Sequence, residues 1–151
     1  MTKQPATATE AVTRLYFQLL DGWNQRDAHV YAALFVEDAT VVGFDGSQMN
    51  GRDEIEATVG QIFAHHMTAV YVGKVREVKL VAPGVALLRA VCGMIPRGQT
   101  DLNPAVNAVQ SLLATQRGDH WEIALFQNTP AQFHGRPDLV EALTAELRAL
   151  L

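Results

Sequence analysis

The chain has few of the residues that form disulfides, basic surfaces or membrane spans. Cys92 is its only cysteine, so no internal disulfide can form, which fits a reducing compartment. The net charge is −4 and no run of Lys or Arg occurs, which argues against a nucleic-acid partner. No stretch approaches the roughly 20 apolar residues of a membrane-spanning helix, and the N-terminus lacks the apolar segment of a secretory signal. We therefore expect a cytoplasmic protein that binds neither membranes nor nucleic acids.

Sequence motifs for cofactors, metals and nucleophilic catalysis are absent as well. The chain has no Gly-rich phosphate loop and no Gly-x-Ser-x-Gly motif. His65 and His66 are neighbours on a predicted helix, where side chains diverge by about 100°, so they cannot easily share one metal ion. Asp38 is the only carboxylate expected near a pocket, and there it serves as a helix cap. We expect no cofactor, no metal and no acid–base pair of carboxylates.

The composition is that of one globular domain. Apolar residues make up 48% of the 151 residues and charged residues 19%, which supports a core without disulfides. Residues 1–8 are small and polar, and we expect a flexible tail there.

Helices are predicted to come first along the chain. Apolar spacings of three and four predict a helix over residues 9–25, capped by Thr9. A short second helix is predicted to begin at Asp27 and to carry Tyr31 and Phe35 on one stripe.

A hairpin and a third helix are predicted next. Residues 39–50 contain Asp45-Gly46, a strong signal for a two-residue turn between strands. Gly51 then opens a helix with carboxylates in its first turn, and an apolar stripe along that helix ends at His66.

The second half of the chain has the pattern of a β-sheet. The predicted strands are 70–81, 85–95, 105–117 and 120–128, and a last helix spans 137–151. Long consecutive strands joined by short turns imply an antiparallel meander. Helices packed on one face of a bent sheet make an α+β fold, with a cavity on the concave side.

Several short motifs occur in a recognisable order. They are Trp23-Asn24 with Asp27, Leu34-Phe35 with Asp38-Ala39, Gly51-Arg52 with Ile55, and Trp121 with Gln127-Asn128-Thr129. Together they resemble the nuclear-transport-factor-2-like superfamily, and within it the SnoaL-like proteins of the SgcJ/EcaC-type group. The resemblance covers residues 9–130, and residues 131–151 form a C-terminal helical extension.

This resemblance implies a cone-shaped α+β fold, in which N-terminal helices pack on a curved antiparallel sheet with an extra C-terminal helix. It also implies a homodimer formed through the sheet and an apolar pocket for a hydrophobic, polyketide-like ligand. It implies no particular chemistry, because the superfamily includes cyclases, isomerases, dehydratases and pure binding proteins.

One histidine and one arginine are candidates for chemistry in the pocket. His66 ends an apolar helix stripe, so an inward imidazole could act as general acid or base. The alternative is a histidine favoured by the dipole at the helix C-terminus. Arg89 alternates with Leu87 and Val91 on a strand and could hold an anionic ligand group. The alternative for Arg89 is an ion pair at a dimer interface or sheet edge.

Amides and large apolar side chains complete the expected ligand site. Asn107 and Gln127 interrupt apolar strands and could orient a ligand carbonyl, or else satisfy sheet ends or the dimer face. Gln127 and Asn128 point to opposite faces, so at most one of them faces the pocket. The other expected ligand contacts are Tyr16, Trp23, Tyr31, Phe35, Met49 and Ile62.

Two functions fit these observations. The first is a small-molecule-binding protein that is accessory to natural-product metabolism, which the missing carboxylate pair favours. The second is a cofactor-free isomerase or cyclase that uses His66 as general acid and base. Both predict a hydrophobic small-molecule partner and a homodimer.

Overall fold

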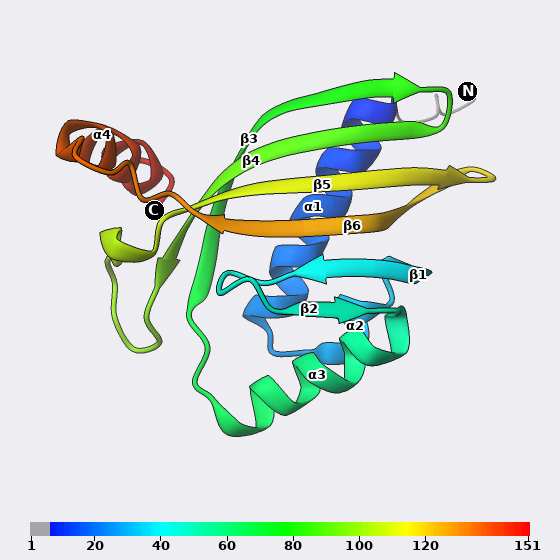
Figure 1. The fold of residues 1–151 in the computed structure, drawn as a ribbon, viewed down its shortest axis with the longest axis horizontal. Helices are drawn as coiled ribbons and strands as arrows, with labels where there is room; N and C mark the ends of the chain where they lie inside the picture. The colour runs from blue at the N-terminus through cyan, green and yellow to red at the C-terminus, as the bar shows by residue number, and fades with distance from the viewer. Residues whose placement is uncertain (1–6) are drawn as a thin grey trace, which may run out of the picture.

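The structure is a computed structural model that describes residues 7–151 (Figure 1). Its helices are α1 (Ala8–Asn24), α2 (Ala28–Ala32), α3 (Arg52–His65) and α4 (Pro137–Arg148). Its strands are β1 (Phe35–Val42), β2 (Gln48–Asn50), β3 (Val70–Ala82), β4 (Val85–Ile95), β5 (Ala108–Arg117) and β6 (His120–Pro130), with a 3-10 turn at Pro104–Val106. A flexible tail was predicted for residues 1–8. Residues 1–6 of this tail lie outside the described residues. No helix in the described range is long and apolar enough to cross a membrane.

The six strands form one curved, unclosed sheet in the order β2-β1-β6-β5-β4-β3 (Figure 1). The four long strands are an antiparallel meander, as predicted. β1 runs parallel to β6, with Val41 opposite Phe126, so the sheet is mixed rather than purely antiparallel. The sequence gives no local signal for this direction, because the two strands are joined by most of the chain rather than by a turn.

The first two helices start at side-chain caps. The hydroxyl of Thr7 accepts a hydrogen bond from the backbone N–H of Glu10 at 3.1 Å, so the cap of α1 is Thr7 and not Thr9. Asp27 caps α2 as predicted and accepts from the backbone N–H of Val30 at 3.0 Å. The short second helix ends before Phe35, because that residue already belongs to β1.

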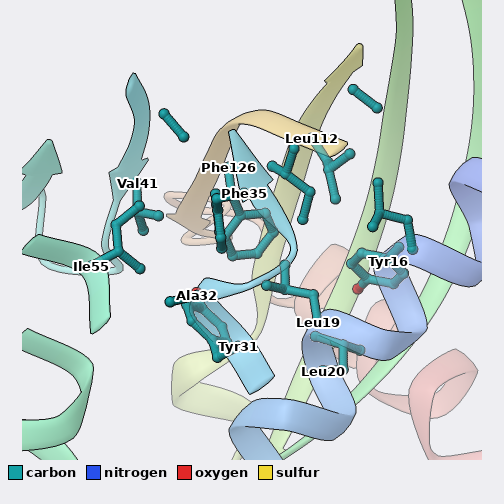
Figure 2. Close-up of a cluster of buried hydrophobic side chains, with 14 of the residues drawn as sticks. Tyr16, Leu19, Leu20, Tyr31, Ala32, Phe35, Val41, Ile55, Leu112 and Phe126 are labelled. Carbon is teal, nitrogen blue, oxygen red and sulfur yellow. The ribbon is translucent and has the colours of Figure 1, made fainter. Parts of the chain in front are cut away.

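The main core lies between α1 and the inner face of the sheet. Tyr16, Leu19 and Leu20 of α1 reach toward this face, where they join Leu112 and Phe126 of β5 and β6 (Figure 2). The α1 helix crosses the long strands, α3 packs beside β1 and β2, and α2 packs against α1 and α3 (Figure 1).

The terminal helix α4 packs at one end of the sheet (Figure 1). Leu143 and Leu147 are buried against Val91 and Leu102, so the helix covers its apolar stripe on its own sheet.

Candidate functional site

A cavity of about 430 Å³ lies between α3, the β1–β2 hairpin and the inner face of the sheet. This volume is within the usual range of small-molecule sites, about 300–1,000 Å³. The lining residues come from both halves of the chain: Trp23, Tyr31, Val41, Val42, Gly43, Phe44, Asp45, Ser47, Gln48, Met49, Thr58, Ile62, Tyr71, Phe126 and Asn128. Most of this surface is apolar, and its polar side chains include Asp45 of the hairpin turn, Thr58 of α3 and Asn128 of β6.

Aromatic rings form one rigid wall of the cavity. The indole of Trp23 stacks on Tyr71 with 5.4 Å between ring centroids and meets Phe63 edge-on at 5.1 Å. The indole N–H of Trp23 donates to the carbonyl of Ala69 at 3.3 Å. The side-chain N–H of Asn24 donates to the backbone carbonyl of Tyr71 at 3.0 Å, and its side-chain oxygen accepts from the backbone N–H of Tyr71 at 2.8 Å. These contacts fix the end of α1 against the start of β3, so the wall is pre-formed.

Neutral polar groups lie at the inner end of the cavity. Asn128 is 6% exposed, and its side-chain oxygen accepts from the amide of Gln110 at 3.2 Å. Tyr31 and Tyr71 line the same region. Burial raises the pKa of both phenols, and a hydrogen bond with Asn128 partly opposes the shift in the pKa of Tyr71. Both tyrosines therefore keep their protons near neutral pH.

The outer end of the cavity carries a carboxylate. Asp45 accepts from the backbone N–H of Ser47 at 3.0 Å and from its hydroxyl at 2.9 Å. These bonds lower the pKa of Asp45, which is a solvent-exposed residue of the hairpin turn. Among residues 7–151 no group of three His, Cys, Asp or Glu side chains is arranged to hold a metal ion.

Solved structures share this architecture over most of the chain. A domain of unknown function with a cystatin-like fold from Nostoc punctiforme is 28% identical, with 95% of this chain and 92% of that chain covered and a TM-score of 0.78. An NTF-2 like protein of unknown function from Shewanella oneidensis is 18% identical, with 79% and 96% covered and a TM-score of 0.65. A ketosteroid isomerase-like protein from Erwinia carotovora is 15% identical, with 81% and 95% covered and a TM-score of 0.63. No family model and no curated protein matches the chain.

The chain has the nuclear-transport-factor-2-like fold. The resemblance to this superfamily is confirmed by the similar structures, and so is the cone-shaped arrangement of helices on a curved sheet. Placement in the SgcJ/EcaC-type group stays a prediction. The similarity shows the fold and assigns no activity.

Four of the predicted ligand contacts line the cavity of this nuclear-transport-factor-2-like fold: Trp23, Tyr31, Met49 and Ile62. Tyr16 and Phe35, which were expected to touch the ligand, are fully buried in the core and do not line the cavity. Both are large aromatic residues of the kind that line pockets, but their side chains pack against other residues of the main core.

The expectation that His66 points inward is wrong. It follows the last residue of α3, has an extended backbone and is exposed to solvent. The guanidinium of Arg26 binds the carbonyls of Phe63 and His66, so α3 ends there and the helical stripe stops short of the histidine.

Arg89 and Gln127 lie outside the cavity as well. Arg89 is on the outer face of β4 and pairs with Glu77 at 3.1 Å, which agrees with the ion-pair alternative. Gln127 is exposed on the same outer face, whereas its neighbour Asn128 faces the cavity. The alternation of β6 predicted that at most one of these two amides would face the cavity but could not say which.

Asn107 is buried, but against α4 and not in the cavity. Its side-chain N–H donates to the hydroxyl of Thr144 in α4 at 2.9 Å, so it holds the terminal helix rather than a ligand. Cys92 is also buried, which raises the pKa of its thiol to about 12. Asp38 belongs to β1, where it is exposed, and not to a helix cap.

Tyr71 and Thr58 line the cavity but were not among the predicted ligand contacts, and of the two amides at the end of β6 the one that lines it is Asn128. Tyr71 had a usable signal, since it follows the polar break after α3 and begins a strand with an aromatic side chain. Thr58 had none, because the predicted stripe of α3 was drawn through its apolar residues alone.

Proposed function

We propose that this protein binds a hydrophobic small molecule in the cavity and does not transform it. The lining carries the proposal, because it is mostly apolar and aromatic, with neutral polar groups at the inner end. Its one charged side chain, Asp45, lies in an exposed turn at the opening. Such a surface favours a ligand that is mostly apolar and carries one polar group, which the polar side chains orient.

The same groups argue against acid–base catalysis. A general acid or base works best when its pKa lies near the working pH. The pKa values of Tyr31 and Tyr71 are raised by burial, and that of Asp45 is lowered by its hydrogen bonds. His66 is exposed outside the cavity, so the isomerase or cyclase alternative lacks the base on which it depended.

The proposal extends to the class of ligand and to the cellular compartment. The resemblance to SnoaL-like proteins favours a polyketide-like ligand and an accessory role in natural-product metabolism. The lone cysteine is buried and suits the reducing cytoplasm in which we place the protein.

A second copy of the chain is the proposed protein partner. Leu87, Leu113 and Leu125 lie opposite one another on three neighbouring strands and are only partly buried on the outer face. Val109 on the same face is 41% exposed. An apolar row of this kind supports the homodimer that the resemblance implies.

The experiment titrates the protein with tetralin and monitors the two tryptophan indole N–H signals by NMR. Trp23 lines the cavity and Trp121 does not, so binding in the cavity moves the first signal and leaves the second in place. Thr58→Phe fills the cavity and should abolish the shift. Ala57→Phe places the same ring on the exposed side of α3 and should preserve it. A Trp23 signal that stays unmoved at the solubility limit of tetralin would reject the proposal.

A further inference from the structure

The lining of the cavity carries charge of one sign only. Within residues 7–151 no lysine, arginine or histidine lines it, and Asp45 in the turn between β1 and β2 is its one carboxylate. Arg26 lies next to the aromatic wall, where its guanidinium stacks on Phe63 at 5.6 Å from the ring centroid. Phe63 does not line the cavity, and the guanidinium binds the carbonyls of Phe63 and His66. The charge that the lining presents to a ligand is therefore negative.

The carboxylate of Asp45 is held in place by the turn that carries it. Its Oδ1 accepts from the backbone N–H of Ser47 at 3.0 Å, and its Oδ2 accepts from the hydroxyl of Ser47 at 2.9 Å. The N–H of Gly43 closes the turn by donating to the carbonyl of Ser47 at 2.8 Å. A carboxylate has about four acceptor sites, so both oxygens retain capacity for a donor of the ligand. A group that is fixed before the ligand arrives loses little conformational entropy on binding.

Aromatic rings share the lining with this carboxylate. Phe44 precedes Asp45 in the same turn and also lines the cavity. The other rings of the lining are Trp23, Tyr31, Tyr71 and Phe126. The face of an aromatic ring is electron-rich and attracts an ammonium group within about 6 Å of its centroid. A cation therefore gains from the rings as well as from the carboxylate, whereas an anion gains from neither.

The charge of the whole chain acts in the same direction. The net charge is −4, which raises the local concentration of cations at a negatively charged opening. Asp45 is exposed to solvent, so an ion pair with it is screened by salt and contributes modestly to affinity. The carboxylate thus selects among ligands, and the apolar body of the ligand supplies most of the binding energy.

We infer that the cavity selects a hydrophobic amine, whose apolar body lies against the aromatic lining and whose ammonium group binds the carboxylate of Asp45 beside Phe44. This inference rests on the proposed binding function and deepens it, because it names the charge of the ligand. A polyketide-like body that carries an amine fits both proposals. Asp45 and Phe44 are binding residues in this arrangement, and no covalent bond of the ligand changes.

The test compares three probes that share one bicyclic body. They are 2-aminotetralin, a cation at neutral pH, the neutral 2-tetralol, and the anion tetralin-2-carboxylate. Their dissociation constants are measured at low salt from the Trp23 indole N–H signal by NMR. We expect 2-aminotetralin to bind roughly three- to tenfold more tightly than 2-tetralol, the range of one exposed ion pair with one cation–π contact. Tetralin-2-carboxylate should bind more weakly than 2-tetralol, and about 0.5 M sodium chloride should reduce the preference for the amine by screening.

Three variants assign the preference to the turn. Asp45→Asn keeps an oxygen that can accept from Ser47 but removes the charge, so it should bring the affinities of amine and alcohol within about twofold of each other. Phe44→Leu keeps an apolar side chain without the ring and should reduce the preference for the amine by about twofold. Asp119→Asn removes the same charge from the exposed turn between β5 and β6, outside the cavity, and should retain the native preference.

The outcomes distinguish this inference from the function on which it rests. If none of the probes moves the Trp23 signal, the binding function fails and the inference fails with it. If 2-tetralol binds and 2-aminotetralin binds no more tightly, the binding function stands and the inference alone is overturned. The inference is likewise overturned if Asp45→Asn keeps the native preference. Equal losses of preference in Asp45→Asn and Asp119→Asn would also overturn it, because the selectivity would then come from the net charge of the chain.

Discussion

Gly73 allows α1 to approach the sheet closely where the core meets the polar end of the cavity. A Cβ atom at this position would collide with the hydroxyl of Tyr16 and would lie 2.7 Å from a methyl group of Leu20. Both side chains are buried, so neither can move away without disturbing the core. Gly73 therefore leaves room on β3 for the phenol of Tyr16, which donates to Gln110.

Gly73→Ala should lower the free energy of unfolding by about 1–3 kcal/mol, the usual cost of an overpacked core. Gly60→Ala is the matched control, because Gly60 lies in α3 and a Cβ there would meet only Ala28 at an ordinary 3.7 Å. That control should raise the free energy of unfolding by about 0.4–1 kcal/mol. Urea unfolding measures both, and a Gly73→Ala protein as stable as the native one would contradict the close approach.

Individual site residues were only partly predictable from the sequence. Trp23, Tyr31, Met49 and Ile62 were predicted to contact the ligand, since large apolar side chains on inward stripes commonly reach a cavity wall. The choice between Gln127 and Asn128 depends on the register of β6 with its neighbours, and a shift of one residue exchanges the two faces. The position of His66 depends on where Arg26, distant in sequence, ends α3.

At the scale of secondary-structure elements, α4 is held to the sheet by ion pairs as well as by its apolar stripe. Glu146 pairs with Lys74 at 3.1 Å and with Arg76, both on β3. Arg148 pairs with Asp101 of the loop after β4 at 2.8 Å. The two cations of β3 lower the pKa of Glu146 from 4.5 to about 2, and Arg148 lowers the pKa of Asp101.

The attachment of α4 should therefore weaken in acid. A carboxylate whose pKa is lower in the folded state stabilises that state fully above its unfolded pKa, and this contribution is lost as the pH falls from about 4.5 through about 2. Hydrogen exchange of the α4 amides should accelerate over this range relative to those of β5. Glu146→Gln should remove most of the acid dependence, and Glu141→Gln, on the exposed side of the helix, should retain it. If the ratio of α4 to β5 exchange rates in the native protein stayed constant over this pH range, the role of these ion pairs would be contradicted.

Elements with a strong local pattern were predicted closely, and those defined by distant contacts were not. The four long strands follow from β-branched runs between clear turn residues, and their antiparallel order follows from short connections. The parallel pairing of β1 with β6 and the early end of α2 have no such local cause. Both depend on where β6 lies in the sheet, because Phe35 pairs with Ile123 and draws the chain into β1.

At the scale of the whole molecule, the two faces of the sheet have different surroundings. The inner face is covered by α1 and, beside the cavity, by α3, whereas α4 covers only one end of the outer face (Figure 1). The remaining outer face carries the apolar row of Leu87, Leu113 and Leu125. The proposed ligand site and the proposed dimer surface therefore lie on opposite faces, so the loss of one need not abolish the other.

Leu113→Lys should convert the proposed dimer into a monomer, because it places a charge in the middle of the apolar row, where a partner would have to bury it unpaired. Light scattering at micromolar concentration measures the mass, and the native chain should scatter as two copies. Gln116→Lys introduces the same charge at the exposed end of β5, away from the row, and should stay dimeric. The tetralin-induced shift of the Trp23 signal should persist in the Leu113→Lys monomer, since the cavity is built from a single chain. A native protein that scatters as a monomer would reject the dimer, and a monomeric variant that loses the tetralin shift would show that the two faces are coupled.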